Sequence, residues 1–272
     1  MRQKNNIVPQ IESVYSNLTQ LEQTIADYFI SEPADEDLSA QAVCGRLFIS
    51  EATLTRFSKK CGFKGYREFI FQYGLQTQRT DEPNDLQTRT VLDTYQELLD
   101  KSYVLLDEAQ MQRVVKLFLQ KKRVFVYGIG SSGCLATEMK IRFMRIGIQI
   151  YAVTDAHVLK MNSVMTDKDT LVVGLSLGGK TNETLSALEE AKKAGATTVL
   201  MTSRNDESLK ECADEIMLVP VKENLDFGNA ISPQFPVMIM VDILFSKILE
   251  SDLYRRSAVH SYTLSKILER KE

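Results

Sequence analysis

Two short segments rich in glycine and hydroxyl side chains carry the residues best suited to bind an anion. The first runs from Gly128 to Gly133 (GIGSSG) and the second from Gly174 to Thr181 (GLSLGGKT). Each follows an apolar run and precedes a helical pattern, so each is expected to join a strand to the N-terminus of a helix. Backbone N–H groups at such a turn, together with serine and threonine hydroxyls, can hold a phosphate.

These segments fit three kinds of site. Gly128–Gly133, with Asp155 at the end of the next strand, formally satisfies a dinucleotide-binding fingerprint. Gly174–Thr181 formally satisfies a Walker A loop. In the third interpretation both loops hold one anion, which is the simpler account because so short a stretch rarely contains both other sites. The residues of this shared site are Gly130, Ser131, Ser132, Ser176, Gly178, Gly179, Lys180 and Thr181.

A basic segment near the N-terminus suggests a second kind of chemistry. Residues 46–79 contain seven basic and two acidic side chains, a charge of +5, whereas residues 1–45 contain two basic and seven acidic ones, a charge of −5. The formal charge of −3 for the whole chain hides this division. Because salt screens exposed charges within about 8–10 Å, a phosphate backbone responds to the local density. A solvated helical face is the alternative to nucleic-acid binding.

The same region shows helical patterns over 18–31, 38–47, 50–62 and 64–73. Two helices joined by a tight turn, the second capped by Ser50 and carrying threonine and arginine outward, are typical of a helix-turn-helix. Arg56 could contact guanine or a phosphate, and the lysines are expected to contact phosphates. The predicted DNA-binding residues are Ser50, Glu51, Thr53, Thr55, Arg56, Lys59, Lys60 and Lys64.

Residues 74–90 are polar and aperiodic, which predicts a linker. Beyond it, helices are expected at 91–106 and 108–120, followed by apolar strands alternating with helices, which indicates a parallel sheet covered on both faces. The fold class is therefore α/β: an N-terminal all-α helix-turn-helix bundle followed by a flavodoxin- or Rossmann-like parallel-sheet sandwich. We expect functional domains over 1–77 and 108–272, with a linker and connecting helix over 78–107. The predicted strands are 123–127, 149–153, 170–175, 197–202 and 215–219, and the predicted helices among them are 134–146, 156–165, 182–194, 236–250 and one at the C-terminus.

Composition excludes several classes of protein. Four cysteines without metal-like spacing favour reduced, buried thiols, and two histidines leave little material for a metal site. The first ten residues lack an apolar stretch and no apolar run reaches about 18 residues, so neither a signal peptide nor a membrane span is expected. We expect a cytoplasmic protein with no metal, cofactor or membrane partner.

The segment LSAQAVCGRLFISEATLTRFSKKCGFKGYREF resembles the helix-turn-helix of RpiR-type transcription regulators. Two positions depart from that pattern: Phe48 stands where glycine or asparagine is common in the turn, and Cys44 stands at the small position of the first helix. A phenylalanine resists the positive φ that such a turn needs, so either the turn differs or the residue is strained. The matching residues are Ser50, Ala52, Thr53, Arg56, Lys59, Lys60, Gly62, Phe63, Gly65 and Tyr66.

The later part of the chain resembles the sugar isomerase (SIS) domain that usually follows this helix-turn-helix. There Gly178 replaces a serine, and the segment 231–236 lacks an arginine that is often present. The matching residues are Ser131 and Ser132 in the first loop, Ser176, Gly179 and Thr181 in the second, and Asp155, His157, Met161 and Ser163 between them.

The resemblance implies a transcription regulator of carbohydrate metabolism that binds operator DNA and senses a phosphorylated sugar, a hexose or hexosamine phosphate. A homodimer or homotetramer is also expected, because paired helix-turn-helix units gain specificity from symmetric half-sites. His157 and Glu183 lie where a sugar isomerase would need a general base, but fusion to a DNA-binding domain favours sensing, so both are placed among the ligand-binding residues and no enzyme activity is expected. A sugar-phosphate isomerase and an NAD-linked redox sensor remain the alternatives.

Overall fold

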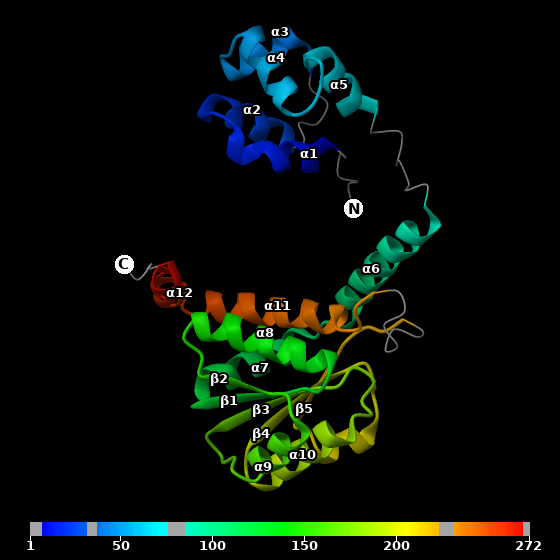
Figure 1. Ribbon diagram of the computed structural model, residues 1–272, viewed down its shortest axis with the longest axis vertical. Helices are drawn as coiled ribbons and strands as arrows, with labels where there is room; N and C mark the ends of the chain where they lie inside the picture. The colour runs from blue at the N-terminus through cyan, green and yellow to red at the C-terminus, as the bar shows by residue number, and fades with distance from the viewer. Residues whose placement is uncertain (1–6, 32–36, 76–84, 223–230, 269–272) are drawn as a thin grey trace. The chain divides into compact units, whose positions relative to one another are not determined.

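The computed structural model describes residues 7–31, 37–75, 85–222 and 231–268. The chain divides into two compact units, Met1–Pro83 and Asn84–Glu272 (Figure 1). We call them the N-terminal unit and the C-terminal unit and describe each by itself. In the described ranges no helix combines the length and the apolar character needed to cross a membrane. Nor does any group of three His, Cys, Asp or Glu side chains there lie close enough together to hold a metal ion.

The N-terminal unit is all helical, as predicted. Its core is a cluster of aromatic rings in which Phe29 and Phe69 meet edge to face with centroids 4.9 Å apart, while Phe57 and Tyr73 pack against them. The helices are α1 (Ile7–Val14), η1 (Tyr15–Asn17), α2 (Gln20–Ile30), α3 (Ala40–Leu47), α4 (Glu51–Lys60) and α5 (Tyr66–Leu75), of which the sequence pattern did not reveal α1. Gly62, at φ 92°, follows the end of α4 as expected.

The C-terminal unit is built on a five-stranded parallel sheet with the order β2-β1-β3-β4-β5. The strands are β1 (Arg123–Tyr127), β2 (Ile150–Val153), β3 (Thr170–Leu175), β4 (Thr197–Thr202) and β5 (Glu215–Leu218). The helices are α6 (Leu86–Leu105), α7 (Glu108–Gln120), α8 (Ser131–Arg145), α9 (Ala156–Ser163), α10 (Asn182–Lys193), η2 (Glu207–Glu211), α11 (Phe235–Glu250) and α12 (Leu253–Leu268). The predicted α/β class is confirmed.

Helices cover both faces of this sheet (Figure 1). On one face α7, α8 and α11 contribute Phe118, Phe143 and Leu244 to the larger core, and on the other α9 and α10 contribute Leu159 and Leu188 to a second one. All residues of the central strand β3 are buried. A strand covered on both sides must be apolar nearly throughout, which is why its sequence shows no alternation.

Two helix boundaries differ from the prediction in ways that matter. The helix α6 begins at Leu86, inside the expected linker 74–90, with the carboxylate of Asp85 accepting a hydrogen bond from the N–H of Thr88. It belongs to the C-terminal unit, where the buried Leu98 joins the larger core. The helix α8 begins at Ser131 rather than at residue 134, so both loop serines lie in its first turn.

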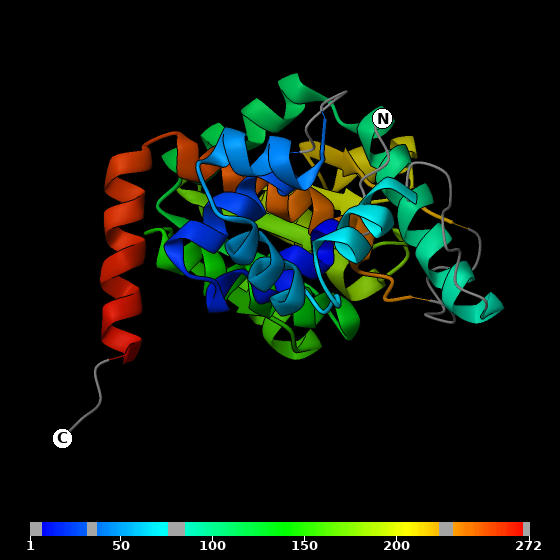
Figure 2. The same cartoon turned by 90° about the horizontal axis from the view of Figure 1, so that it is seen from above.

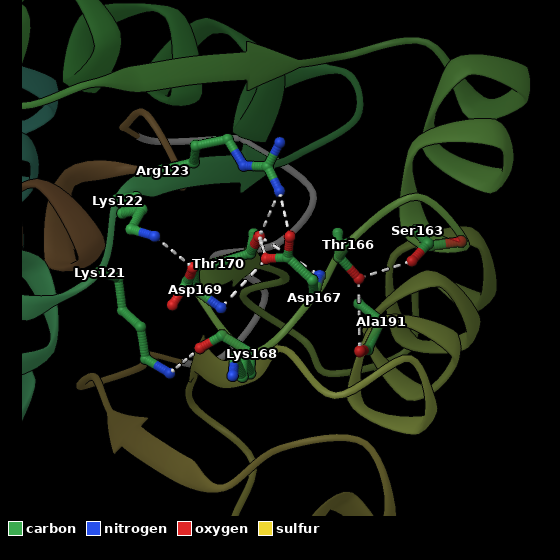
Figure 3. Close-up of polar contacts among 10 residues, drawn as sticks. All are labelled: Lys121, Lys122, Arg123, Ser163, Thr166, Asp167, Lys168, Asp169, Thr170 and Ala191. Carbon is green, nitrogen blue, oxygen red and sulfur yellow. Dashed lines mark hydrogen bonds and ion pairs between the residues drawn. The ribbon is translucent and has the colours of Figure 1, made fainter.

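Ion pairs tie the strands together at the amino end of the sheet (Figure 3). Lys122 pairs with Asp169 and Arg123 with Asp167, each at 2.7 Å, and the ammonium of Lys121 donates to the carbonyl of Lys168 at 2.6 Å. These side chains are largely exposed, so each pair adds little stability. Together they hold the turn before β3 against the start of β1.

Candidate functional site

The strand order places the two glycine-rich loops at the same point of the sheet. In the order β2-β1-β3-β4-β5 the chain leaves β1 toward one edge and β3 toward the other, and such a switch point opens a crevice at the carboxyl ends of the two strands. Tyr127 pairs in register with Gly174, so the loops that follow are neighbours. The predicted convergence of the loops thus has a topological basis.

The first loop is formed by a close approach between backbone segments. A Cβ atom on Gly128 would lie 2.6 Å from the carbonyl oxygen of Ser132, so only glycine lets the first turn of α8 lie this near. Gly130, at φ 62°, is the N-cap residue of α8. The side chain of Ser131 is exposed and Ser132 is buried.

The second loop is held in shape by its own hydroxyl groups. The hydroxyl of Ser176, a residue only 2% exposed, donates to Oγ1 of Thr181 at 3.0 Å, and the N–H of Gly179 donates to the Ser176 carbonyl at 3.0 Å. Gly179 has φ 60° and lies against Thr202 and Arg204. Gly178 is half-buried, whereas Lys180 is exposed at the rim.

The helices that start at these loops lack side-chain caps. Within the described residues, no side chain accepts a hydrogen bond from the N–H groups of the first turn of α8 or α10; the hydroxyl of Ser176 accepts only from the N–H of Thr181, which precedes α10. By contrast, Asp107 caps α7 and Asp155 caps α9. Uncapped helix N-termini present unsatisfied N–H donors and a partial positive charge, which is an arrangement that can attract an anion to the carboxyl ends of β1 and β3.

The structure adds two residues that the sequence pattern did not indicate. The amide of Gln234, at the start of α11, donates to the hydroxyl of Ser131 at 3.2 Å, and its buried Oε1 lacks a partner among the described residues. The guanidinium of Arg204 donates to the carbonyl of Gly179 at 3.1 Å and pairs with Asp206 at 2.5 Å. The contacts with Ser131 and Gly179 join distant parts of the chain, so spacing alone gives no signal for them.

The two candidate bases lie on helices, outside the two glycine-rich loops. His157 and Glu183 are both exposed, in the first turns of α9 and α10. The carboxylate of Asp155 accepts hydrogen bonds from the N–H groups of His157 and Val158, which lower the pKa of Asp155. The carboxylate of Asp155 therefore caps the helix α9. In a dinucleotide site the same carboxylate would bind a ribose hydroxyl, so the ribose would have to compete with these N–H groups.

In the N-terminal unit a chain of hydroxyl contacts positions Arg56. Ser50 accepts a hydrogen bond from the N–H of Thr53, the two hydroxyls lie 2.9 Å apart, and the guanidinium of Arg56 donates to Oγ1 of Thr53 at 3.2 Å. Thr53 is only 6% exposed, which differs from the expected outward stripe, because its hydroxyl turns back toward the helix cap. Glu51 and Arg56 are exposed, and Thr55 is half-buried.

The lysines of this unit have different surroundings. Lys59 and Lys64 are exposed. Lys60, although partly exposed, pairs at 2.7 Å with Glu22, whose side chain is 5% exposed. Burial alone would raise the pKa of Glu22, but hydrogen bonds from Lys60 and Thr19 hold it below its ordinary value. Lys60 therefore neutralises a buried charge in the bundle, which sequence spacing could not show.

Comparison with known proteins agrees with this architecture. Residues 5–76 match the rpiR-family helix-turn-helix domain, and residues 117–246 match the SIS domain. The chain belongs to the RpiR-type transcription regulators. An uncharacterized HTH-type transcriptional regulator from Haemophilus influenzae is 29% identical, over 100% of this chain and 99% of its own.

Two further relatives extend the comparison. The transcriptional regulator RpiR of Escherichia coli K12 is 24% identical and covers 91% of this chain and 87% of its own. The solved structure of Vibrio vulnificus NanR complexed with ManNAc-6P has the same fold, with a TM-score of 0.61 and 22% identity over 98% of this chain and 100% of NanR. The relatives compared by sequence are named as transcriptional regulators.

One departure from the RpiR-type pattern leaves the turn of the helix-turn-helix strained. Phe48 adopts the left-handed conformation, with φ 54° and ψ 44°, and its side chain is 94% exposed. The turn between α3 and α4 therefore forms with phenylalanine in a conformation that favours glycine or asparagine. A non-glycine residue in this conformation costs roughly 1–2 kcal/mol.

We expect Phe48→Asn to stabilise the N-terminal unit by about 1 kcal/mol, because asparagine tolerates the left-handed conformation and no buried contact is lost. Hydrogen exchange of the α4 amides should slow accordingly. Phe71→Asn is the matched control, since Phe71 is also exposed but lies inside the helix α5, where asparagine is a poor helix former. Equal effects of both substitutions would contradict strain at Phe48.

Proposed function

We propose that this RpiR-type regulator binds a phosphorylated sugar, a hexose or hexosamine phosphate, in the crevice between β1 and β3. Binding there changes its affinity for operator DNA. The observation that carries the proposal is the meeting of two uncapped helix N-termini and two hydroxyl-bearing loops at the switch point of the sheet. Sugar hydroxyls and a phosphate together match donors of this kind.

The geometry suggests how the ligand would be divided between the loops. The phosphate would be held by Ser176, Gly179, Lys180 and Thr181, while Ser131, Ser132 and Gln234 face the sugar. The NanR complex with ManNAc-6P supports a phosphosugar for this fold. Gly178 supplies no hydroxyl, and one hydrogen bond to a charged group is worth roughly 1.5–3 kcal/mol. The N–H groups of the uncapped helix α10 and the ammonium of Lys180 are the donors that can offset the loss of this hydrogen bond.

The N-terminal unit would read operator DNA through α4. Arg56 is presented by Ser50 and Thr53, and the ammonium groups of Lys59 and Lys64 add positive charge to the same unit. A single helix-turn-helix contacts few base pairs, so symmetric half-sites and hence a homodimer or homotetramer are part of the proposal. We expect the oligomer to have one arrangement that binds DNA tightly and one that binds it weakly. The sugar phosphate can release or recruit the protein only if it binds these two arrangements with different affinities.

The proposal is tested by thermal-shift screening of the full chain against hexose phosphates, hexosamine phosphates and NAD(H). A gel mobility-shift assay with DNA from its own promoter region follows. We expect stabilisation by at least one phosphosugar, and a change in DNA retardation caused by that same compound. Stabilisation by NAD alone would overturn the site, and turnover of the sugar phosphate without DNA binding would favour an isomerase.

A further inference from the structure

A cavity lies at the amino end of the sheet, opposite to the loop site. Its volume is about 300 Å³, and it is bounded by the end of α7, the turn 146–149 before β2, and the helix α12. Figures 1 and 2 together show α12 turning away from the axis of α11 to stand at the edge of the C-terminal unit. The volume is at the lower end of the range typical of small-ligand pockets, about 300–1,000 Å³.

The charged side chains that line this cavity are all basic. They are Lys121, Lys122, Arg255 and Arg256, with no acidic residue among the lining side chains. The ammonium groups of the two lysines are already bound, since Lys121 donates to the carbonyl of Lys168 and Lys122 pairs with Asp169 (Figure 3). Lys122 is thereby neutralised, whereas Lys121 and the guanidinium groups of the two arginines have no carboxylate partner among the described residues.

Those guanidinium groups are incompletely bonded. Arg256 donates one hydrogen bond, at 2.9 Å, to the carbonyl of Ile146 at the end of α8, but its buried Nε lacks an acceptor among the described residues. The buried Nε of Arg145, next to Ile146 in sequence, lacks one as well. Arg255 is exposed, and no hydrogen bond or ion pair of the described residues engages its guanidinium. Buried donors of a charged group are costly to leave unpaired, so the guanidinium of Arg256 is under-bonded within the described chain.

Electrostatics support the same conclusion. Burial lowers the pKa of Arg256 below its ordinary value, and the neighbouring Arg255 lowers it further, while Asp252 opposes this in part. Helix C-termini carry a partial negative charge, which explains the bond from Arg256 to the end of α8 but not the second arginine or the cavity itself. Guanidinium groups bind phosphate and carboxylate through paired hydrogen bonds.

We propose that this cavity is a second anion site, in which Arg255 and Arg256 bind a small oxyanion, a phosphate group or a carboxylate. The site is separate from the loop site, because the two lie at opposite ends of the parallel strands. The helix α8 connects them, with Ser131 at one end and Arg145 at the other. The proposal does not depend on the sugar ligand.

Titration of the full chain with inorganic phosphate, and separately with malonate, at constant ionic strength tests the site. In the double variant Arg255→Gln with Arg256→Gln we expect at least tenfold weaker binding of one of these anions, observed by calorimetry. The matched control is Lys116→Gln, which removes a positive charge from an exposed position on α7 outside the cavity. Identical titration curves for the double variant and this control would overturn the proposal.

Two further measurements separate anion binding from the structural role of Arg256 and from contact with DNA. Arg256 also caps α8, so Arg255→Gln alone is compared with the native chain; it is expected to keep the native melting temperature and still weaken anion binding several-fold. If the arginine variants lose binding of inorganic phosphate, the ligand is a phosphate group. If they lose binding of malonate, it is a carboxylate. If the double variant instead loses affinity for DNA while binding both anions normally, the arginines contact the DNA backbone and the proposal is wrong.

Discussion

Gly128→Ala is expected to abolish the response of the protein to its sugar phosphate while DNA binding in the absence of ligand persists. The added methyl group would lie 2.6 Å from the carbonyl oxygen and 2.8 Å from the carbonyl carbon of Ser132. Both atoms are backbone, so no side chain can rotate away and the first turn of α8 must move. Overpacking of this kind costs about 1–3 kcal/mol, and displacing the N–H groups from the anion should weaken its binding more than tenfold.

Gly45→Ala is the control for this substitution. A Cβ atom on Gly45, in the helix α3, would meet nothing within 4 Å. Alanine favours a helix over glycine by up to about 1 kcal/mol, so this variant should be at least as stable as the native chain and respond normally to ligand. Calorimetric titration with the phosphosugar found by screening compares the two. Native affinity in Gly128→Ala would show that the first loop does not bind the ligand.

Most of the fold can be predicted from the sequence because local signals agree with the tertiary structure. The strands β1, β3 and β4 each contain a run of apolar residues, as expected for strands covered on both faces, although Thr198 and Thr202 of β4 are also buried. The helix α1 was missed because its apolar positions, Ile7, Val8 and Ile11, are few and Pro9 interrupts them. Proline is tolerated there only because it lies in the first turn of the helix.

The site is predictable where the chemistry is local. Glycine and hydroxyl residues inside one turn identify both loops, and the resemblance to the SIS domain identifies their common ligand class. Gln234 could not be found this way, since it meets Ser131 from 103 positions away. Nor could spacing show that Lys60 pairs with Glu22, 38 positions earlier, or that Cys134 is exposed where buried thiols were expected.

Arg56→Ala is expected to remove specific operator binding while stabilisation by the phosphosugar stays intact. Arg56 is exposed on α4, and Thr53 and Ser50 fix its direction through short hydroxyl contacts. An arginine that reads a guanine contributes about 1–3 kcal/mol of discrimination, or roughly fivefold to more than a hundredfold in affinity per half-site. Competition mobility shifts with operator and unrelated DNA should show affinity for the operator falling to the level for unrelated DNA.

The comparison with Lys59→Ala decides whether Arg56 reads bases. Lys59 is exposed on the same helix and is expected to contact a phosphate, so its loss should weaken binding to every sequence alike and lower the salt slope by about one. Arg56→Ala should instead reduce the ratio of specific to nonspecific affinity. Equal losses on both DNAs would make Arg56 another phosphate contact. Loss of ligand stabilisation as well would mean that Arg56 supports the fold rather than the recognition of DNA.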